Sequence, residues 1–124
     1  MRNICFAVIC CATLSATAQT NEQVERELQR QRVPHAEIVL AQARLETGNF
    51  TSRRCREDKN IFGIKHGKRY AKYRRWQDSV ADYKERISSR YVKGDYYAFL
   101  RKIGYAEDAA YSRKVAEIVR TSKK

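Results

Sequence analysis

The chain has 124 residues and carries 26 Lys and Arg against 14 Asp and Glu, a formal charge of +12. This length suffices for one domain, and 43% hydrophobic with 32% charged residues argues against a wholly disordered chain. One proline and five glycines exclude a collagen-like or proline-rich fibre.

Residues 1–18 have the layout of a secretory signal peptide. Arg2 precedes an apolar run from Ile4 to Leu14, and Ala16-Thr17-Ala18 follows as a small-x-small cleavage site. The apolar run is too short to span a bilayer, and the alternative is an N-terminal core helix. We therefore expect an exported domain of residues 19–124 that has no transmembrane segment.

Removal of such a signal leaves Cys55 as the only cysteine of the domain, so no internal disulfide is expected. The flanking arginines of the run 53–56 would lower the pKa of its thiol. A thiol enzyme also needs a base, and His35 and His66 are the only histidines. We expect neither a catalytic thiol nor a metal, and no cofactor.

The domain begins with two predicted helices. The run 20–23, Thr-Asn-Glu-Gln, fits a capping box that opens a polar helix to about Arg32. Pro34 suits the first turn of a second helix, which runs to Thr47 and stops at Gly48. The second helix is apolar on nearly every side, which predicts that it lies in the middle of the domain.

An irregular basic stretch then leads into a predicted β-hairpin. Its first strand is 61–65, its turn is His66-Gly67-Lys68, and its second arm, 69–76, alternates loosely. The segment from Ile61 to Gln77 contains no acidic residue. Aromatic residues interleave with its bases, which suits a sugar polymer or a nucleic acid, whereas the alternative is a solvated hairpin face. These residues are Tyr70, Tyr73 and Trp76.

Three further helices complete the predicted domain. Asp78 or Ser79 caps the first, and Asp95 caps the second, which ends at Gly104. Asp108 caps the third, whose apolar stripe holds Tyr111, Val115, Ile118 and Val119. The sequence therefore predicts a mainly α (α+β) domain with one short β-hairpin.

Glu46 stands in an unfavourable place at the C-terminal end of the central helix. The helix macrodipole disfavours negative charge there, and the residues on its face are mostly apolar. These residues are Val39, Gln42 and Ala43. Both effects raise the pKa of a carboxyl group, as a glycosidase acid requires. The alternative is a side chain that faces water or pairs with Arg44, Arg53 or Arg54.

Three segments carry a family resemblance. The run 40–48, LAQARLETG, followed by Ser52, is similar to A-Q-A-x-L-E-[ST]-G-x-x-x-S. The run 60–65, NIFGIK, is similar to N-[LI]-F-G-[IV]-K, and 104–111, GYAEDAAY, is similar to Y-A-[TE]-D-x-x-Y. In this order and spacing they resemble the bacterial glucosaminidase family, glycoside hydrolase family 73, over residues 34–119.

The resemblance implies a lysozyme-like domain that cleaves peptidoglycan glycan strands after N-acetylglucosamine. It implies that Glu46 is the general acid and that Tyr105 steadies the transition state or the N-acetyl group. Phe62 and Tyr111 are also expected to pack in the core, and Asp108 to serve as an N-cap. The expected substrate-binding residues are Gln42, Asn60, Phe62, Gly63, Lys65, Tyr83 and Tyr111.

The chain departs from the family in its hairpin, where many relatives have a second carboxylate that activates water. Two routes stay open. The substrate's own N-acetyl oxygen attacks the anomeric carbon, or a base comes from elsewhere in the chain. The candidates for such a base are Glu57, Asp58 and Asp82.

The leading hypothesis is a monomeric peptidoglycan hydrolase in the periplasm or outside a bacterial cell, with its basic surface on the anionic wall. One alternative is a catalytically weak wall-binding module of the same fold. Another is a lytic transglycosylase, although its typical G-x-x-G-L-M-Q-like segment is absent. A secreted nucleic-acid binder rests on charge and aromatic residues alone, and we do not expect nucleic acid as a partner.

Overall fold

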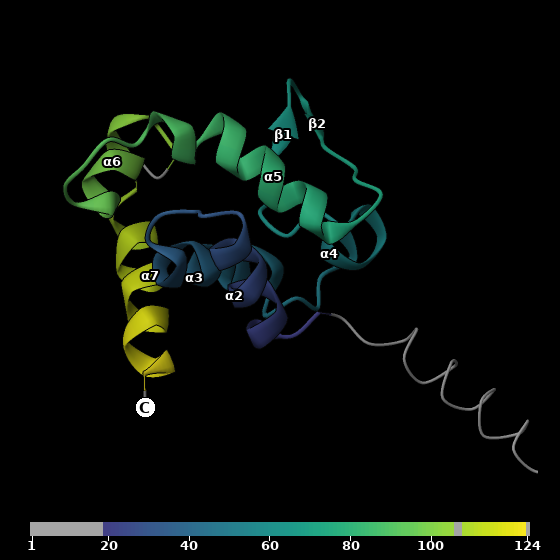
Figure 1. Cartoon of the computed structure of the whole chain (residues 1–124), viewed down its shortest axis with the longest axis horizontal. Helices are drawn as coiled ribbons and strands as arrows, with labels where there is room; N and C mark the ends of the chain where they lie inside the picture. Colours follow the sequence, from purple (N-terminus) through teal and green to yellow (C-terminus); the bar gives the residue numbers. More distant parts are fainter. Residues whose placement is uncertain (1–18, 106–107, 124) are drawn as a thin grey trace, which may run out of the picture.

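The computed structural model describes residues 19–105 and 108–123, so the expected signal peptide lies outside the described part. This part contains six helices and one small antiparallel hairpin (Figure 1), which confirms the predicted mainly α, lysozyme-like class. None of the described helices is both long and apolar enough to cross a membrane.

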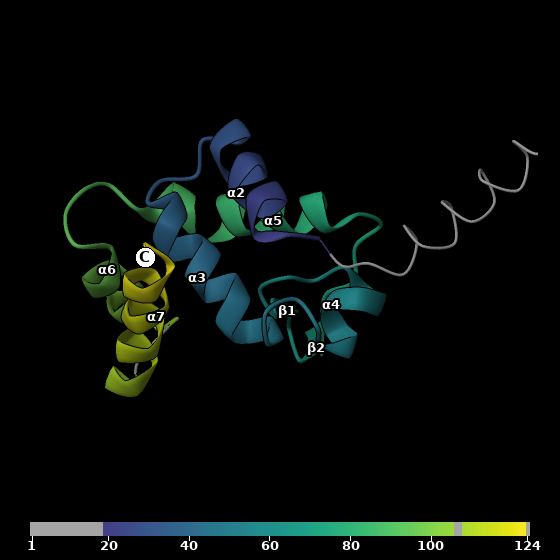
Figure 2. The same cartoon turned by 90° about the horizontal axis from the view of Figure 1, so that it is seen from below.

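Helix α3 (Ala36–Thr47) lies at the centre of the domain, as its apolar sequence predicts. It packs against α2 (Asn21–Arg30) on one side and α7 (Ala109–Ser122) on another, an arrangement visible in Figures 1 and 2. Six of its residues are buried. They are Ile38, Val39, Ala41, Gln42, Ala43 and Thr47.

Most of the expected caps are present. The Thr20 side chain and Gln23 close the predicted capping box of α2, which ends two residues earlier than expected. Gly48 ends α3 in the left-handed conformation, with φ of 58°. Asp95 caps α6 (Tyr96–Lys102), and Asp108 caps α7 through the amide of Ala110.

Two helix starts differ from the expectation. Pro34 lies before α3 instead of in its first turn, because the chain turns through His35 in the left-handed conformation, with φ of 54°. Helix α5 (Trp76–Arg86) begins before Asp78. Asp78 stands at the third helical position and reaches back to the Arg75 amide at 3.3 Å, so it acts as a partner of the cap and not as the cap.

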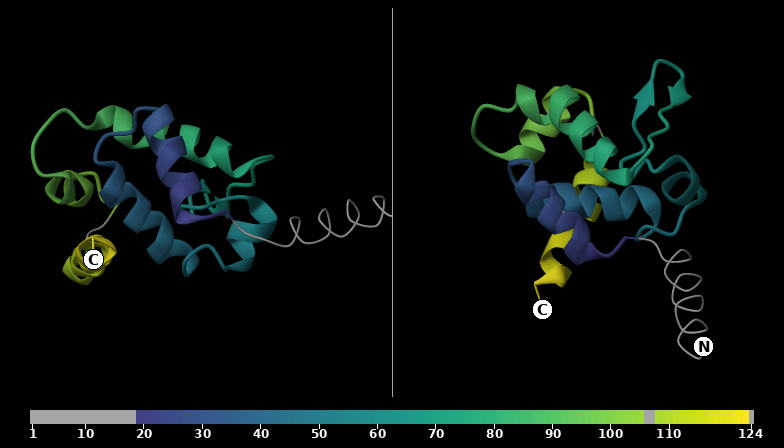
Figure 3. Two further views of the ribbon diagram at one scale, coloured as in Figure 1. Left: turned by 60° about the horizontal axis from the view of Figure 1, so that its bottom comes forward. Right: turned by 45° about the vertical axis from the view of Figure 1, so that its right-hand side comes forward.

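The basic stretch expected to be irregular contains a short helix, α4 (Arg53–Asp58), capped by Ser52. The hairpin is smaller than predicted: β1 (Lys65–His66) pairs with β2 (Arg69–Tyr70) around a turn at 67–68. The hairpin stands out from the helical body beside α4 and α5 (Figure 3). A 3-10 helix, η1 (Ser88–Arg90), follows α5.

Candidate active site

Glu46 occupies the last turn of α3, where the loop 60–64 approaches it. Its Oε1 atom lies 3.4 Å from the position that a Cβ atom would take on Gly63. Because Gly63 has no side chain and a φ of +67°, the loop backbone can pass this close to the carboxyl group. The Glu46 residue as a whole is exposed to solvent, whereas its carboxyl group is partly buried beside the loop.

The surroundings of Glu46 favour its protonated form. Burial of the carboxyl raises the pKa of Glu46 above its ordinary value of 4.5, and a hydrogen bond from Tyr111 partly offsets this effect. The three arginines considered as ion-pair partners of the Glu46 carboxylate contact other groups. Arg44 bonds Asn49 and Ser122, Arg53 pairs with Glu57, and Arg54 stacks on Tyr70.

A buried hydrogen-bonded chain lies one turn before Glu46. The Tyr83 hydroxyl donates to the Gln42 carbonyl at 2.5 Å, and the Gln42 amide donates to the Tyr111 hydroxyl at 3.2 Å. The Tyr83 hydroxyl also lies 2.8 Å from that of Tyr96. Gln42 thus links α5, α6 and α7 to α3 and satisfies its own buried amide.

Tyr105 joins this cluster through its ring. Its centroid lies 6.1 Å from that of Tyr111 and 6.2 Å from that of Tyr83. Phe62 packs on Tyr83 at 4.5 Å. Burial, followed by the neighbouring Tyr111 and Glu46, raises the pKa of Tyr105 well above its ordinary value, so its phenol stays neutral and can donate a hydrogen bond.

Asn60 builds the loop that meets Glu46. It is fully buried, and its amide donates to the carbonyls of Ile64 at 2.9 Å and Ala71 at 3.0 Å. Its carbonyl accepts from the amides of Phe62 at 3.3 Å and Ile64 at 3.1 Å. A buried amide that satisfies four backbone groups holds the loop in one conformation, and with it the position of Gly63.

Lys65 is the one predicted site residue that lies apart from this cluster in the contacts it makes. It stands on β1, exposed, with its ammonium 4.9 Å from the centroid of the Tyr70 ring. The cluster brings together the other predicted site residues, Gln42, Glu46, Asn60, Phe62, Gly63, Tyr83, Tyr105 and Tyr111. Tyr96 belongs to it but has no motif in the sequence that marks it.

A second polar cluster connects the hairpin to α5 around Asp82. Its Oδ2 atom accepts from His66 at 2.7 Å and from Tyr73 at 2.6 Å, and its Oδ1 atom accepts from Arg86 at 2.8 Å. Burial alone would raise the pKa of Asp82, but these three hydrogen bonds outweigh it and lower the pKa below 3.8. No sequence motif brings these residues together, because they meet only in the folded chain.

Glu57, Asp58 and Cys55, the remaining candidates for chemistry, contact other parts of the protein. Glu57 is exposed and bonded to Arg53 at 2.9 Å, while the backbone carbonyl of Asp58 accepts from the Tyr73 amide at 2.9 Å. The expected lowering of the pKa of the Cys55 thiol was wrong. Burial raises this pKa, and the hydrogen bond from Gln19 and the nearby cations offset the rise only in part. Among residues 19–105 and 108–123, no group of three or more His, Cys, Asp or Glu could hold a metal ion.

One known family matches most of the chain. The family model for mannosyl-glycoprotein endo-beta-N-acetylglucosaminidase matches residues 21–124. No curated protein and no solved structure matches the chain significantly. Because the family model spans nearly the whole described chain, the protein belongs to the glucosaminidase family of glycosidases.

Proposed function

We propose that this protein is an endo-β-N-acetylglucosaminidase that cleaves the glycan strands of peptidoglycan after N-acetylglucosamine, with Glu46 as its general acid. The observation that carries the proposal is the surroundings of Glu46, an exposed residue whose carboxyl has a raised pKa, adjoins Gly63 and accepts a hydrogen bond from Tyr111. Membership of the glucosaminidase family supports the class of bond. A raised pKa favours the protonated carboxyl that a glycosidic leaving oxygen needs.

In the proposed reaction, Glu46 gives its proton to the glycosidic oxygen while the bond from that oxygen to the anomeric carbon breaks. The carbonyl oxygen of the substrate's N-acetyl group attacks the same carbon from the opposite side and forms a cyclic intermediate. Ionised Glu46 then removes a proton from a water molecule. The water oxygen bonds to the anomeric carbon, the bond from this carbon to the N-acetyl oxygen breaks, and the ring opens. Two displacements at one carbon give retention of configuration.

Three phenols assist in this proposal without changing their own charge. Tyr105 donates a hydrogen bond to the N-acetyl group or to the developing charge, and Tyr111 supports the carboxylate that remains on Glu46. Tyr83 holds Gln42 and the ring of Phe62 in place beneath the sugar. Lys65, which lies apart, contacts a more distant part of the glycan.

The substrate-assisted route is preferred because two of the three candidate bases, Asp82 and Glu57, have competing partners. Both oxygens of Asp82 accept hydrogen bonds, and its lowered pKa makes it a weak base. Glu57 is paired with Arg53. Proton NMR of freshly released product decides between the routes, since retention supports assistance and inversion requires a separate base.

The surroundings of Glu46 are also compatible with two other functions. A wall-binding module of weak activity would follow if no group activates the attack, and a lytic transglycosylase would use the same acid but release an anhydro-sugar. Digestion of purified peptidoglycan by the wild type and by Glu46→Gln, with mass spectrometry of the products, separates the three. A reducing N-acetylglucosamine end that is lost in Glu46→Gln supports the hydrolase, whereas wall binding without products supports the module.

We also propose that residues 1–18 direct export, which places the protein beside peptidoglycan in the periplasm or outside the cell. Expression of the full chain in a bacterium tests this. N-terminal sequencing of exported protein should find a start at Gln19, and full-length protein retained in the cytoplasm would contradict it.

A further inference from the structure

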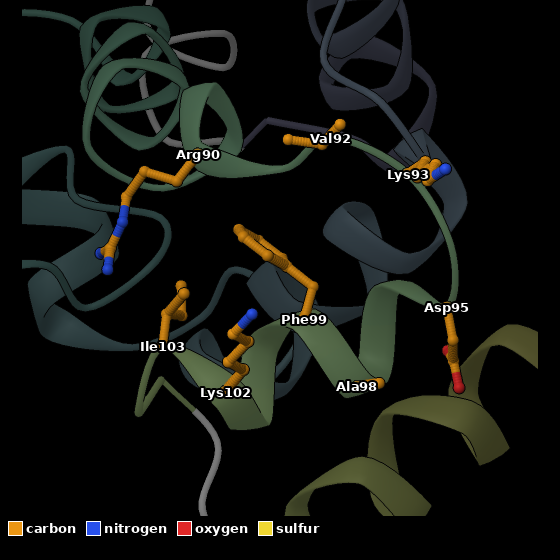
Figure 4. A pocket seen from close by; sticks show the side chains of 8 residues that line it. All are labelled: Arg90, Val92, Lys93, Asp95, Ala98, Phe99, Lys102 and Ile103. Carbon is orange, nitrogen blue, oxygen red and sulfur yellow. The ribbon is translucent and has the colours of Figure 1, made fainter.

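A basic pocket lies next to Tyr96, at the edge of the tyrosine cluster, and takes no part in the proposed bond cleavage. It has a volume of about 420 Å³ and is enclosed by η1, the connection that follows it and α6 (Figure 4). Side chains from both sides of this space line it. They include Arg90, Val92, Lys93, Phe99, Lys102 and Ile103.

The lining combines an apolar floor with a cationic rim. The half-buried Phe99 packs on Tyr91 at 5.3 Å and on Tyr96 at 5.2 Å, and Figure 4 shows it projecting into the space between α6 and the connection. Val92 is 86% exposed and adds apolar surface from the other side. Apolar side chains left accessible beside a concavity mark binding surfaces.

The rim has an excess of positive charge. Arg90, Lys93 and Lys102 are all exposed, and none forms an ion pair with a carboxylate of residues 19–105 or 108–123. Asp95 is the only acid in the lining, and its Oδ1 atom accepts from the Tyr97 amide at 3.0 Å. The pocket therefore suits an anionic ligand that also carries small apolar groups.

The pocket shares its inner wall with the tyrosine cluster. Phe99 stacks on Tyr96, whose hydroxyl lies 2.8 Å from that of Tyr83. At the other end, Ile103 of the lining stands two residues before Tyr105. A branched polymer could therefore reach both places, with its main chain at the tyrosine cluster and its side branch in the pocket.

We propose that this pocket binds the peptide branch of the glycan, an acidic peptide with small aliphatic side chains and a free carboxylate. This inference rests on the proposed function for its biological meaning, because peptidoglycan carries such peptides on its sugars. A concave site of this volume, at the lower end of the roughly 300–1,000 Å³ typical of ligand pockets, suits a short peptide. A membrane surface would instead need a continuous apolar face, whereas the apolar Tyr96 and Leu100 of α6 point into the core.

Direct binding tests the pocket without any catalysis. The probe is a fluorescent Ala-Glu-Lys-Ala peptide with a free C-terminal carboxylate, titrated into wild type and into Lys93→Glu/Lys102→Glu. The control is Lys84→Glu/Lys114→Glu, which changes two exposed lysines and the net charge equally on α5 and α7. We expect saturable binding that weakens on the order of tenfold in the pocket variant and less than twofold in the control.

Equal weakening in both variants would show attraction by net charge alone and would overturn the proposal, as would the lack of saturable binding by wild type. Vesicles of anionic lipid form a separate arm. Binding of vesicles, but not peptide, that is lost in Lys93→Glu/Lys102→Glu would assign the pocket to a membrane and also overturn it. Glu46→Gln should bind the peptide as wild type does, so an inactive enzyme would leave this result intact.

Discussion

Glu46 and Asp82 are two carboxylates of one domain whose surroundings drive their pKa values in opposite directions. Glu46 meets a backbone loop and neutral phenols, and burial raises the pKa of its carboxyl. Asp82 is also partly buried, but three donors, two of which can carry positive charge, lower its pKa. The two carboxylates differ in the donors that they receive, three at Asp82 against Tyr111 at Glu46, and in the proposed function this difference separates a proton donor from a structural anion.

The largest expected effect concerns Glu46→Gln. The amide keeps the shape but cannot give up the proton, so the rate of glycan cleavage should fall by roughly a hundred- to ten-thousandfold. The measurement is the initial rate on purified peptidoglycan, together with thermal unfolding to show that the fold persists. Glu117→Gln serves as the control, because Glu117 is exposed and paired with Arg120 on α7. A rate within threefold of wild type would remove Glu46 from the reaction.

Gln42→Leu should produce the largest loss of stability. The leucine has a similar size but leaves the Tyr111 hydroxyl without a donor and removes the 2.5 Å bond from Tyr83. We expect the free energy of unfolding to fall by about 2–3 kcal/mol, as measured by urea denaturation. The matched substitution Gln77→Leu, on the partly exposed first turn of α5, should cost less than about 0.5 kcal/mol. Equal losses at the two positions would show that the chain through Gln42 does not hold the helices together.

Asp82→Asn tests whether the Asp82 carboxylate stabilises the fold through its three hydrogen bonds. Loss of the charge weakens three hydrogen bonds, so unfolding should become easier by about 1.5–3 kcal/mol at neutral pH. A lowered folded pKa contributes stability that is present above the unfolded value near 3.8 and is lost as pH falls through the folded pKa. The difference between wild type and variant should therefore shrink in acid, and the catalytic rate should fall far less than in Glu46→Gln. A rate loss as large as that of Glu46→Gln would identify Asp82 as the missing base.

Gly63→Ala has the smallest expected effect on stability. At a φ of +67° an L side chain costs about 1–2 kcal/mol, and the new methyl would lie 3.4 Å from Oε1 of Glu46. We expect a modest loss of stability and a further rise in the pKa of Glu46, because the methyl displaces water from its carboxyl. Gly67→Ala provides the control, since its φ is +68° and no atom lies within 4 Å of the added group. An equal change of the Glu46 pKa in both variants would contradict the close approach of the loop.

Much of the fold follows from local signals in the sequence. The caps at Thr20, Asp95 and Asp108 and the stop at Gly48 depend on neighbouring residues alone. Helix α4 was missed because its six residues, RRCRED, bury only Cys55 and so show no apolar period. The start of α3 was misplaced because a left-handed His35 has no clear sequence signal.

The candidate site was predictable only in part. Glu46 and Tyr105 stand out through their motifs, and Gln42 shares a helical face with Glu46. Tyr96 has no such motif, and Asp82 was expected as a possible base without its partners. Tyr83 lies 13 residues from Tyr96 and His66 lies 16 residues from Asp82, so both pairs meet only through packing. The sequence therefore marks the proposed acid, whereas the hydrogen-bonded network beside it and the carboxylate that anchors the hairpin require the fold.

A carboxyl-carbon NMR titration of Glu46, assigned by comparison with Glu46→Gln, tests the central claim most directly. A folded pKa above 4.5 means that stability falls as pH rises from that value through the folded pKa, so Glu46→Gln should gain stability relative to wild type over the same interval. The account predicts a midpoint above 4.5 that coincides with the upper limit of the pH range for cleavage. A midpoint at or below 4.5 would show an ordinary ionised carboxylate and would contradict the account.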